Sequence, residues 1–233
     1  MSSQVRAMFA SIARRYDHGN QILSMGFHHR WRRLGVKLSG AKPGSRVLDC
    51  ATGTGDLAFE FQRAVGPSGQ VIGIDFCAEM LEIARAKASR EGLPTRFAEA
   101  DALRLPYEDG SFDVASIAFG IRNLDDPARG VAEMARVVRA GGSVVVLEFG
   151  QPGGALFGPL YRFYSANVIP RIGGWVTGER HAYEYFHRTS SEFPCGPAFV
   201  SLMESTERFS EVRARRMTGG ITHIYVGIVG APS

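Results

Sequence analysis

A short glycine-containing stretch constrains this chain more than any other feature. Val47 to Cys50 form a mostly apolar run that predicts a strand, and Gly53 and Gly55 follow within five residues of its end. Glycines after the carboxyl end of a strand let a ligand approach the backbone, because they have no Cβ. Asp75 ends the next apolar run, about 20 residues past the loop, where a carboxylate accepts hydrogen bonds from ribose hydroxyls. Together these features predict a site for an adenosyl compound.

The loop also discriminates among adenosyl compounds. Asp56 and Leu57 interrupt the G-x-G-x-x-G pattern of dinucleotide sites, and an acidic residue at a helix start repels a pyrophosphate. A sulfonium and an amino group are cationic, so the same residue suits S-adenosylmethionine as cofactor. The alternative is that Asp56 only caps its helix and Asp75 only begins a turn.

Length and composition predict one domain. The 233 residues suffice for a single α/β domain over residues 1–233, with an N-terminal helical cap at 1–40 and a helical lid at 151–200. No run of about 18 apolar residues and no secretory signal is present, which predicts a cytoplasmic protein. The three cysteines lack C-x-x-C spacing, so we expect neither a disulfide framework nor a metal site.

The charge pattern bears on partners. A net charge of +4 suits nucleic acid or an anionic membrane surface, and basic residues gather at 30–33 and 213–216. No long basic run or aromatic ladder accompanies them, so nucleic acid is not an expected partner and a solvated positive face is the simpler interpretation. The oligomeric state is left open, with a homodimer as one alternative.

Apolar periodicity predicts alternating helices and strands, and therefore a doubly wound, mostly parallel sheet. Helices are expected at about 5–38, 56–64, 78–90 and 127–138, and strands at 46–50, 71–75, 95–99, 112–119 and 143–149. The runs 211–217 and 221–229 predict an antiparallel C-terminal hairpin. Ligands bind beyond the carboxyl ends of such strands, which draws attention to Asp49, Asp101, the segment 119–123 and Glu148. A carboxylate at Asp101 suits an adenine amino group, Ala102 lets the ring approach, and Met80 pads it.

At these positions the sequence resembles the UbiE/MenG ubiquinone/menaquinone biosynthesis C-methyltransferases over nearly the whole chain. The resemblance is carried by Tyr16–Asn20 with Leu23, Ser24, His28 and Trp31, by 48–56, by Phe119–Asn123, by 136–142 with 147–149, by Ala182–Tyr185 and by 218–221. It implies a Rossmann-like class I methyltransferase fold and methyl transfer from S-adenosylmethionine to a ring carbon of a reduced prenylated quinone, most simply demethylmenaquinol to menaquinol. Thr54, Asp75, Asp101 and Ala102 match the family's cofactor positions, whereas Ala118, Gly19, Ala140 and Gly150 depart from its usual residues.

Ring methylation requires that a quinol hydroxyl lose its proton. Arg122 suits the developing phenolate, Asn123 can hold the hydroxyl, and Tyr16 can orient the ring or relay the proton. The resemblance implies proton abstraction by the Arg through water; His28 is an alternative base, and packing is the simpler role for it. Likewise, Arg122 pairing with a surface carboxylate such as Asp125 is the simpler alternative for that residue.

The segment 155–175 is aromatic and follows the fifth strand. It predicts either a lid over a prenyl tail, with arginines that contact anionic headgroups at the inner face of the membrane, or a plain cover for the sheet. Two other functions stay open: methylation of another small molecule or lipid, and binding of an adenosyl ligand without catalysis.

Overall fold

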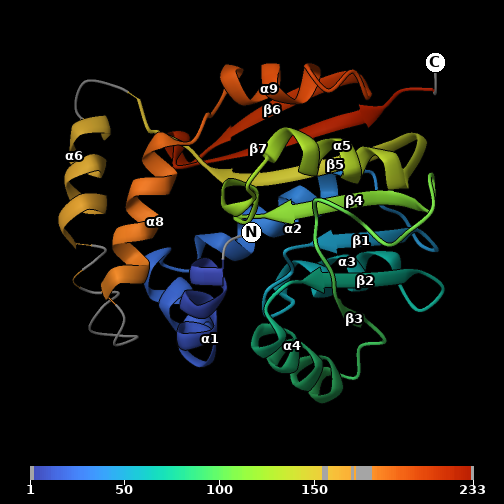
Figure 1. Cartoon of the computed structure of the whole chain (residues 1–233), viewed down its shortest axis with the longest axis horizontal. Coiled ribbons are helices and arrows are strands. Elements are labelled where there is room, and N and C mark those ends of the chain that lie inside the picture. The colour runs from blue at the N-terminus through green and yellow to red at the C-terminus, as the bar shows by residue number, and fades with distance from the viewer. Residues whose placement is uncertain (1–2, 154–156, 169–170, 172–179, 232–233) are drawn as a thin grey trace.

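In the computed structural model, which describes residues 3–153, 157–168, 171 and 180–231, seven strands form one sheet in the order β3-β2-β1-β4-β5-β7-β6 (Figure 1). The five strands β1 to β5 run parallel, and β7 and β6 pair antiparallel at one edge. The predicted doubly wound sheet with an antiparallel hairpin is therefore confirmed. The strands are β1 (Arg46–Cys50), β2 (Gln70–Asp75), β3 (Arg96–Glu99), β4 (Phe112–Ala118), β5 (Val138–Phe149), β6 (Phe209–Met217) and β7 (Thr222–Val229).

Helices cover both faces of the sheet. One layer holds α2 (Phe27–Leu38) and α3 (Asp56–Val65), and the other holds α5 (Pro127–Val137) and α9 (Pro197–Glu204), while α4 (Ala78–Glu91) packs on β2 and β3. The helices α3 and α4 begin at Asp56 and Ala78, as predicted. Their apolar residues recur at helical spacing, which is why the sequence indicated them. For α5, Pro127 occupies the first turn and the Asp126 carboxylate accepts a hydrogen bond from the Arg129 amide.

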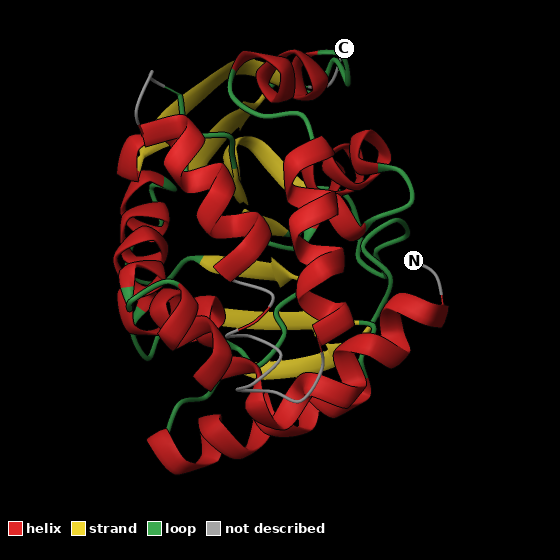
Figure 2. Cartoon of the chain, turned by 90° about the vertical axis from the view of Figure 1, so that its left-hand side faces the viewer, coloured by secondary structure: helices red, strands yellow, loops and turns green. Residues whose placement is uncertain are grey.

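The carboxyl ends of the parallel strands point toward a separate group of helices. This group contains α1 (Ser3–Leu23), α6 (Phe157–Phe163) with the π-helical turn Tyr164–Val168, and α8 (Arg180–Glu192), which lie together at the left of Figure 1. Figure 2 looks onto this edge and shows helices crossing in front of the strands. The crevice in which α/β proteins bind ligands is therefore covered.

Two boundaries differ from the prediction. The helix expected at 5–38 is two helices, because Met25 and Gly26 adopt positive φ and turn the chain between α1 and α2. The strand expected to begin at residue 143 begins at Val138, and its pairing with β4 shifts register across the two glycines at 141–142. Of the predicted cap, α2 belongs to the sheet layer, where Gly35 packs against Leu147, and only α1 lies over the strand ends.

Candidate active site

The two glycines of the loop after β1, Gly53 and Gly55, have different surroundings. A Cβ on Gly53 (φ 55°) meets no protein atom within 4 Å, so this position opens onto free space, as predicted for a ligand contact. A Cβ on Gly55 (φ 88°) would lie 2.8 Å from the Phe59 ring. Packing against α3 therefore requires a glycine at position 55, and close approach of a ligand to the backbone is consistent with position 53.

Asp75 is anchored by the backbone. Its Oδ2 accepts a hydrogen bond from the Gly53 amide at 2.8 Å, and its Oδ1 accepts one from the Cys77 amide at 3.0 Å. Burial raises the pKa of this carboxyl, while the backbone amides act in the opposite direction. Each oxygen keeps a lone pair that can accept a further hydrogen bond, which is what binding a ribose diol requires.

A small cavity of about 40 Å³, the cofactor cavity, lies beside this carboxylate. It brings together four of the predicted cofactor residues, Gly53, Asp75, Met80 and Ala118, with small side chains at the ends of β1 and β4 and with two aromatic side chains from α1. Its lining residues are Phe9, Tyr16, Ala51, Gly53, Asp75, Phe76, Met80, Ala118, Phe119, Gly120 and Asn123.

The other predicted cofactor residues do not line this cavity. Asp49 is buried beneath the loop, where its oxygens accept hydrogen bonds from Thr52 (2.6 Å) and Ser116 (2.7 Å), and burial raises its pKa to about 6. The Thr54 hydroxyl points to α1. Asp101 is exposed and accepts a hydrogen bond from the Leu103 amide, and Ala102 packs in the core.

A larger cavity of about 450 Å³, the acceptor cavity, lies between α1, α2, α8 and the ends of β4 and β5. Most of its lining is aromatic or aliphatic, with Arg122, His28 and Tyr185 among the few polar groups. Phe9, Tyr16 and Phe119 line both cavities. The two cavities are therefore separated by three aromatic side chains, two of them from α1.

Arg122 is held in a buried ion pair. Its Nη1 donates hydrogen bonds to the Phe119 carbonyl at 2.6 Å and to Glu148 Oε1 at 2.8 Å, and the two side chains are 6% and 1% exposed. The guanidinium lies over the rings of Phe149 and Phe186. The partner of Arg122 is thus the buried carboxylate of Glu148 at the end of β5, whereas the simpler alternative placed a surface carboxylate there.

Asn123 and Tyr16 lie where the cavities meet. The Tyr185 hydroxyl donates a hydrogen bond to Asn123 Oδ1 at 3.1 Å, which links the helix α8 to the cofactor cavity. Burial raises the pKa of Tyr16 above its usual value of 10, although hydrogen bonding to Asn20 lowers it somewhat. Tyr16 is therefore a hydrogen-bond donor at neutral pH.

His28 is buried and lines the acceptor cavity. Burial and then the charge of Arg32 lower its pKa to about 4, so the ring is neutral at pH 7. The Ser24 hydroxyl donates its proton to the Asn20 carbonyl at 2.6 Å, so its contact with His28 Nδ1 requires the proton on the imidazole. This tautomer leaves Nε2 as a hydrogen-bond acceptor, but the low pKa makes it a weak base.

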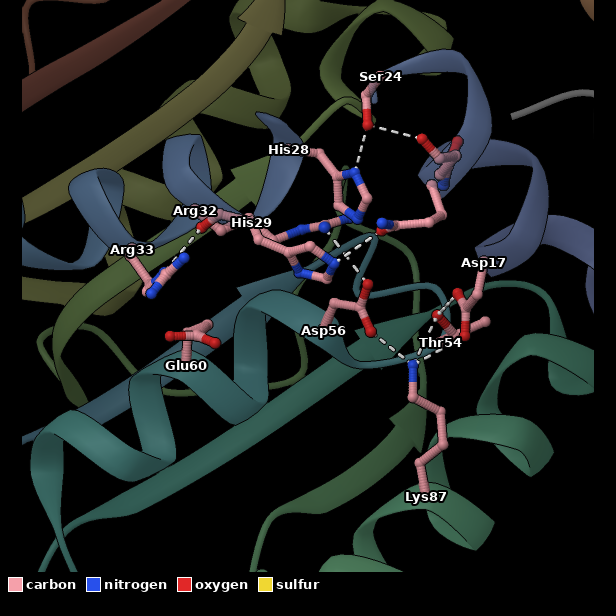
Figure 3. A network of polar contacts seen from close by, with 12 residues as sticks. Asp17, Ser24, His28, His29, Arg32, Arg33, Thr54, Asp56, Glu60 and Lys87 are labelled. Carbon is pink, nitrogen blue, oxygen red and sulfur yellow. Dashed lines mark hydrogen bonds and ion pairs between the residues drawn. The ribbon is translucent and has the colours of Figure 1, made fainter. Parts of the chain in front are cut away.

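A second polar network joins α1 to the loop (Figure 3). Lys87 donates to Asp17 at 2.9 Å and to Asp56 at 2.5 Å, the Thr54 hydroxyl donates to Asp17 at 2.5 Å, and Arg32 lies 3.3 Å from Asp56. Burial alone would raise the pKa of Asp56, but Arg32 and Lys87 outweigh it and lower the pKa. Asp56 is thus paired with two cationic side chains and does not line the cofactor cavity, so in this structure its charge is balanced by the protein itself.

The sequence reasoning missed several residues of this site. Phe9 and Phe186 carried no signal beyond helical periodicity, and nothing in the sequence marked Lys87. Tyr185 belongs to a segment that carries the family resemblance, and Asn123 was predicted as a site residue. The sequence did not show that these two residues form a hydrogen bond. Much of the predicted lid 155–175 lies outside the described residues; its described part supplies Tyr161 and Tyr164 to the acceptor cavity.

Comparisons with known proteins agree with this geometry. The ubiE/COQ5 methyltransferase family matches residues 1–229. A ubiquinone/menaquinone biosynthesis C-methyltransferase UbiE from Bdellovibrio bacteriovorus is 55% identical over 97% of this chain and 95% of its own length. A demethylmenaquinone methyltransferase from Thermus thermophilus is 46% identical over 94% and 99%.

Solved structures support the fold. A SAM-dependent methyltransferase from Thermotoga maritima, described as a possible histamine N-methyltransferase, aligns with a TM-score of 0.66 and 20% identity over 95% of this chain and 98% of that one. The family match and its relatives confirm the prediction of an S-adenosylmethionine-dependent methyltransferase, and the solved structure confirms the fold. The chain belongs to the ubiE/COQ5 methyltransferase family.

Proposed function

We propose that this protein transfers a methyl group from S-adenosylmethionine to a ring carbon of a reduced prenylated quinone, with demethylmenaquinol as acceptor and menaquinol as product. The observation that carries the proposal is the pair of cavities that share Phe9, Tyr16 and Phe119. One has a glycine backbone and a ribose-type carboxylate, and the other is large and apolar enough for a quinol ring with part of a prenyl tail. The names of the relatives favour the same acceptor class.

The residues of the cofactor cavity fit the donor. Gly53 leaves its backbone open, Asp75 offers acceptors to a ribose diol, and Met80 supplies an apolar surface for adenine. When bound, the donor supplies an electrophilic methyl group on a sulfonium. Ligand cavities usually measure several hundred cubic ångströms, compared with about 40 Å³ beneath α1. The cavity as described is therefore too small for the donor, and we infer that α1, which supplies Phe9 and Tyr16 to its wall, moves outward when the donor binds.

On the acceptor side, the residues stabilise a phenolate. Arg122 is positioned by Phe119 and Glu148 as a fixed cation at the wall of the cavity, which suits charge stabilisation better than proton abstraction. Tyr16, protonated at neutral pH, donates to the ring oxygen, and Asn123 is held by Tyr185. His28 Nε2 accepts a hydrogen bond from the quinol hydroxyl and orients it, and the proton passes to a water molecule because the low pKa of His28 makes the imidazole a weak base.

The test is transfer of labelled methyl from S-adenosylmethionine to chemically reduced demethylmenaquinol. The oxidised quinone and a demethylated benzoquinol are assayed in parallel. We expect methylation of the naphthoquinol and none of the oxidised quinone, because the oxidised ring cannot form a phenolate. Binding of the donor without transfer to either quinol would refute the proposal and redirect attention to another acceptor.

The acceptor is a lipid, so peripheral contact with the inner face of the membrane is part of the proposal, as is the predicted cytoplasmic location. No helix in the described part of the chain is long and apolar enough to cross a bilayer. The homodimer left open by the sequence stays a prediction, which light scattering can measure.

A further inference from the structure

The turn between α1 and α2 carries an exposed apolar tip. The side chains of Ile22, Met25 and Phe27 are 38%, 75% and 41% exposed. In the described part of the chain only four large hydrophobic side chains are exposed, and these are three of them. Met25 has a φ of 48°, a conformation that costs a non-glycine residue free energy. The amides of Met25 and Gly26 donate hydrogen bonds to carbonyls in the last turn of α1, and the Phe27 amide donates to the Ser24 carbonyl, which fixes the tip in place. The fold thus holds a strained, solvent-facing methionine in a defined position.

The same tip is the mouth of the acceptor cavity. Met25 and Phe27 line that cavity, yet both are exposed, so the cavity reaches the surface between them. Phe27 stacks on Trp31 further in, and the lining continues through aromatic side chains to Arg122. An apolar chain that enters at Met25 therefore meets mostly apolar side chains, and Arg32, which also lines the cavity, is already paired with Asp56.

Basic residues outnumber acidic ones in the sequence on both sides of this tip. No acidic residue occurs between Asp17 and Asp49, while the same stretch contains six Lys and Arg residues. Arg32 is turned inward to Asp56 (Figure 3), but Arg30 is exposed one turn after Phe27. Arg14 and Arg15 of α1 are also exposed, and Arg15 lies two helical turns before Ile22.

We propose that the α1–α2 tip docks on an anionic lipid bilayer, inserts Met25 and Phe27 among the acyl chains, and admits the acceptor's prenyl tail directly from the membrane. This inference rests on the proposed function, since it takes the acceptor to be a membrane lipid. Three apolar side chains are too few for a stable protein interface, which usually buries about 800 Å² on each partner. An apolar tip flanked by exposed arginines on both adjoining helices is instead the pattern of interfacial membrane binding.

The experiment measures co-sedimentation of the full chain with vesicles of phosphatidylcholine, with and without 30% phosphatidylglycerol. We expect Ile22→Ser/Met25→Ser to bind the anionic vesicles at least about fivefold more weakly than the wild type. Arg14→Gln/Arg30→Gln should lose the preference for phosphatidylglycerol. Arg208→Gln/Arg215→Gln, which removes the same charge from the exposed strand β6 region, is the matched control and should bind like the wild type. Circular dichroism verifies folding of each variant.

Methyl transfer separates this inference from the proposed function. With a tail-less naphthoquinol in solution, Arg14→Gln/Arg30→Gln should match the wild type, and with prenylated acceptor in anionic vesicles it should be at least about fivefold slower. No transfer to any quinol would refute the function, whatever the vesicle result. Equal vesicle binding by the wild type and both tip variants, or no binding at all, would overturn the docking surface. A change in oligomeric state with unchanged vesicle binding would overturn it too, by assigning the tip to a second copy of the chain.

Discussion

The ion pair between Arg122 and Glu148 makes a sharp prediction, because its contributions to stability and to turnover are separable. Arg122→Met leaves the Glu148 carboxylate 1% exposed with only the backbone amides of residues 122 and 149 as donors. Removing one partner of a buried pair usually costs 3–5 kcal/mol, and because these donors remain we expect about 3 kcal/mol. Glu148→Gln keeps an acceptor for the Phe149 amide, so about 2 kcal/mol is expected.

The double variant Arg122→Met/Glu148→Gln leaves neither charge unpaired. We expect it to lose about 2 kcal/mol, which gives a coupling of about 3 kcal/mol between the two residues. Turnover behaves differently: both variants without the arginine should lose about 100-fold or more, whereas Glu148→Gln should stay within about tenfold of the wild type. Recovery of stability without recovery of turnover is the signature of a catalytic cation.

Urea unfolding measures the stabilities, and turnover is assayed at a temperature where every variant is folded. The control cycle uses Arg139 and Asp113, an ion pair of 2.7 Å whose side chains are 52% and 28% exposed. Its coupling should be below about 1 kcal/mol. A double variant that methylates at the wild-type rate would refute the role given to Arg122, and a coupling no larger than that of the control would refute the energetic reasoning.

Three further predictions follow from the site. Gly53→Ala should weaken S-adenosylmethionine binding by about tenfold or more in calorimetry, and its positive φ should lower the free energy of unfolding by only about 1–2 kcal/mol. The control Gly92→Ala, at a similar φ and with open space around its Cβ, should show the same loss of stability and no loss of binding. Equal binding by the two variants would place the donor elsewhere. Lys87→Met should lower the free energy of unfolding by about 2–3 kcal/mol, an amount kept small because Asp17 is 42% exposed. The variant should also speed donor exchange in stopped flow, because α1 is no longer held to the loop by this ion pair. Unchanged exchange would show that Lys87 does not hold α1 in place. Because the pKa of Asp49 is raised from 3.8 to about 6, its contribution to stability is full below pH 4 and is lost as pH rises through 6. Relative to the wild type, Asp49→Asn should therefore gain about 3 kcal/mol between pH 4 and 7 in urea unfolding, and a constant difference would contradict the raised pKa.

Local patterns made the sheet predictable. The buried strands β1, β4 and β5 are apolar on both faces, and the glycine loop follows β1 as expected, because these signals extend over a few neighbouring residues. The turn that separates α1 from α2 was not predicted, because a methionine such as Met25 gives no indication in the sequence of a positive φ. Family resemblance supplied Tyr16, Arg122 and Asn123, which periodicity alone would not have marked.

What escaped prediction depends on pairing across the chain. Arg122 meets Glu148 from 26 positions away, and Lys87 meets Asp17 from 70. Which residues pair depends on how α1, α4 and the strand ends pack in the fold. No local pattern in a single sequence indicates pairs that are separated by so many residues. For the same reason Asp56 suggested a cofactor contact from its position, although two cations from other helices already surround it.

The aromatic partition formed by Phe9, Tyr16 and Phe119 has a kinetic consequence. Phe9 and Tyr16 belong to α1, so an outward motion of α1 that lets the spent donor leave would also join the cofactor cavity to the acceptor cavity. The positive φ at Met25 and Gly26 makes this turn the natural pivot. Product quinol and demethylated donor should accordingly depart in the same opening event, and a single slow conformational step should govern each catalytic cycle.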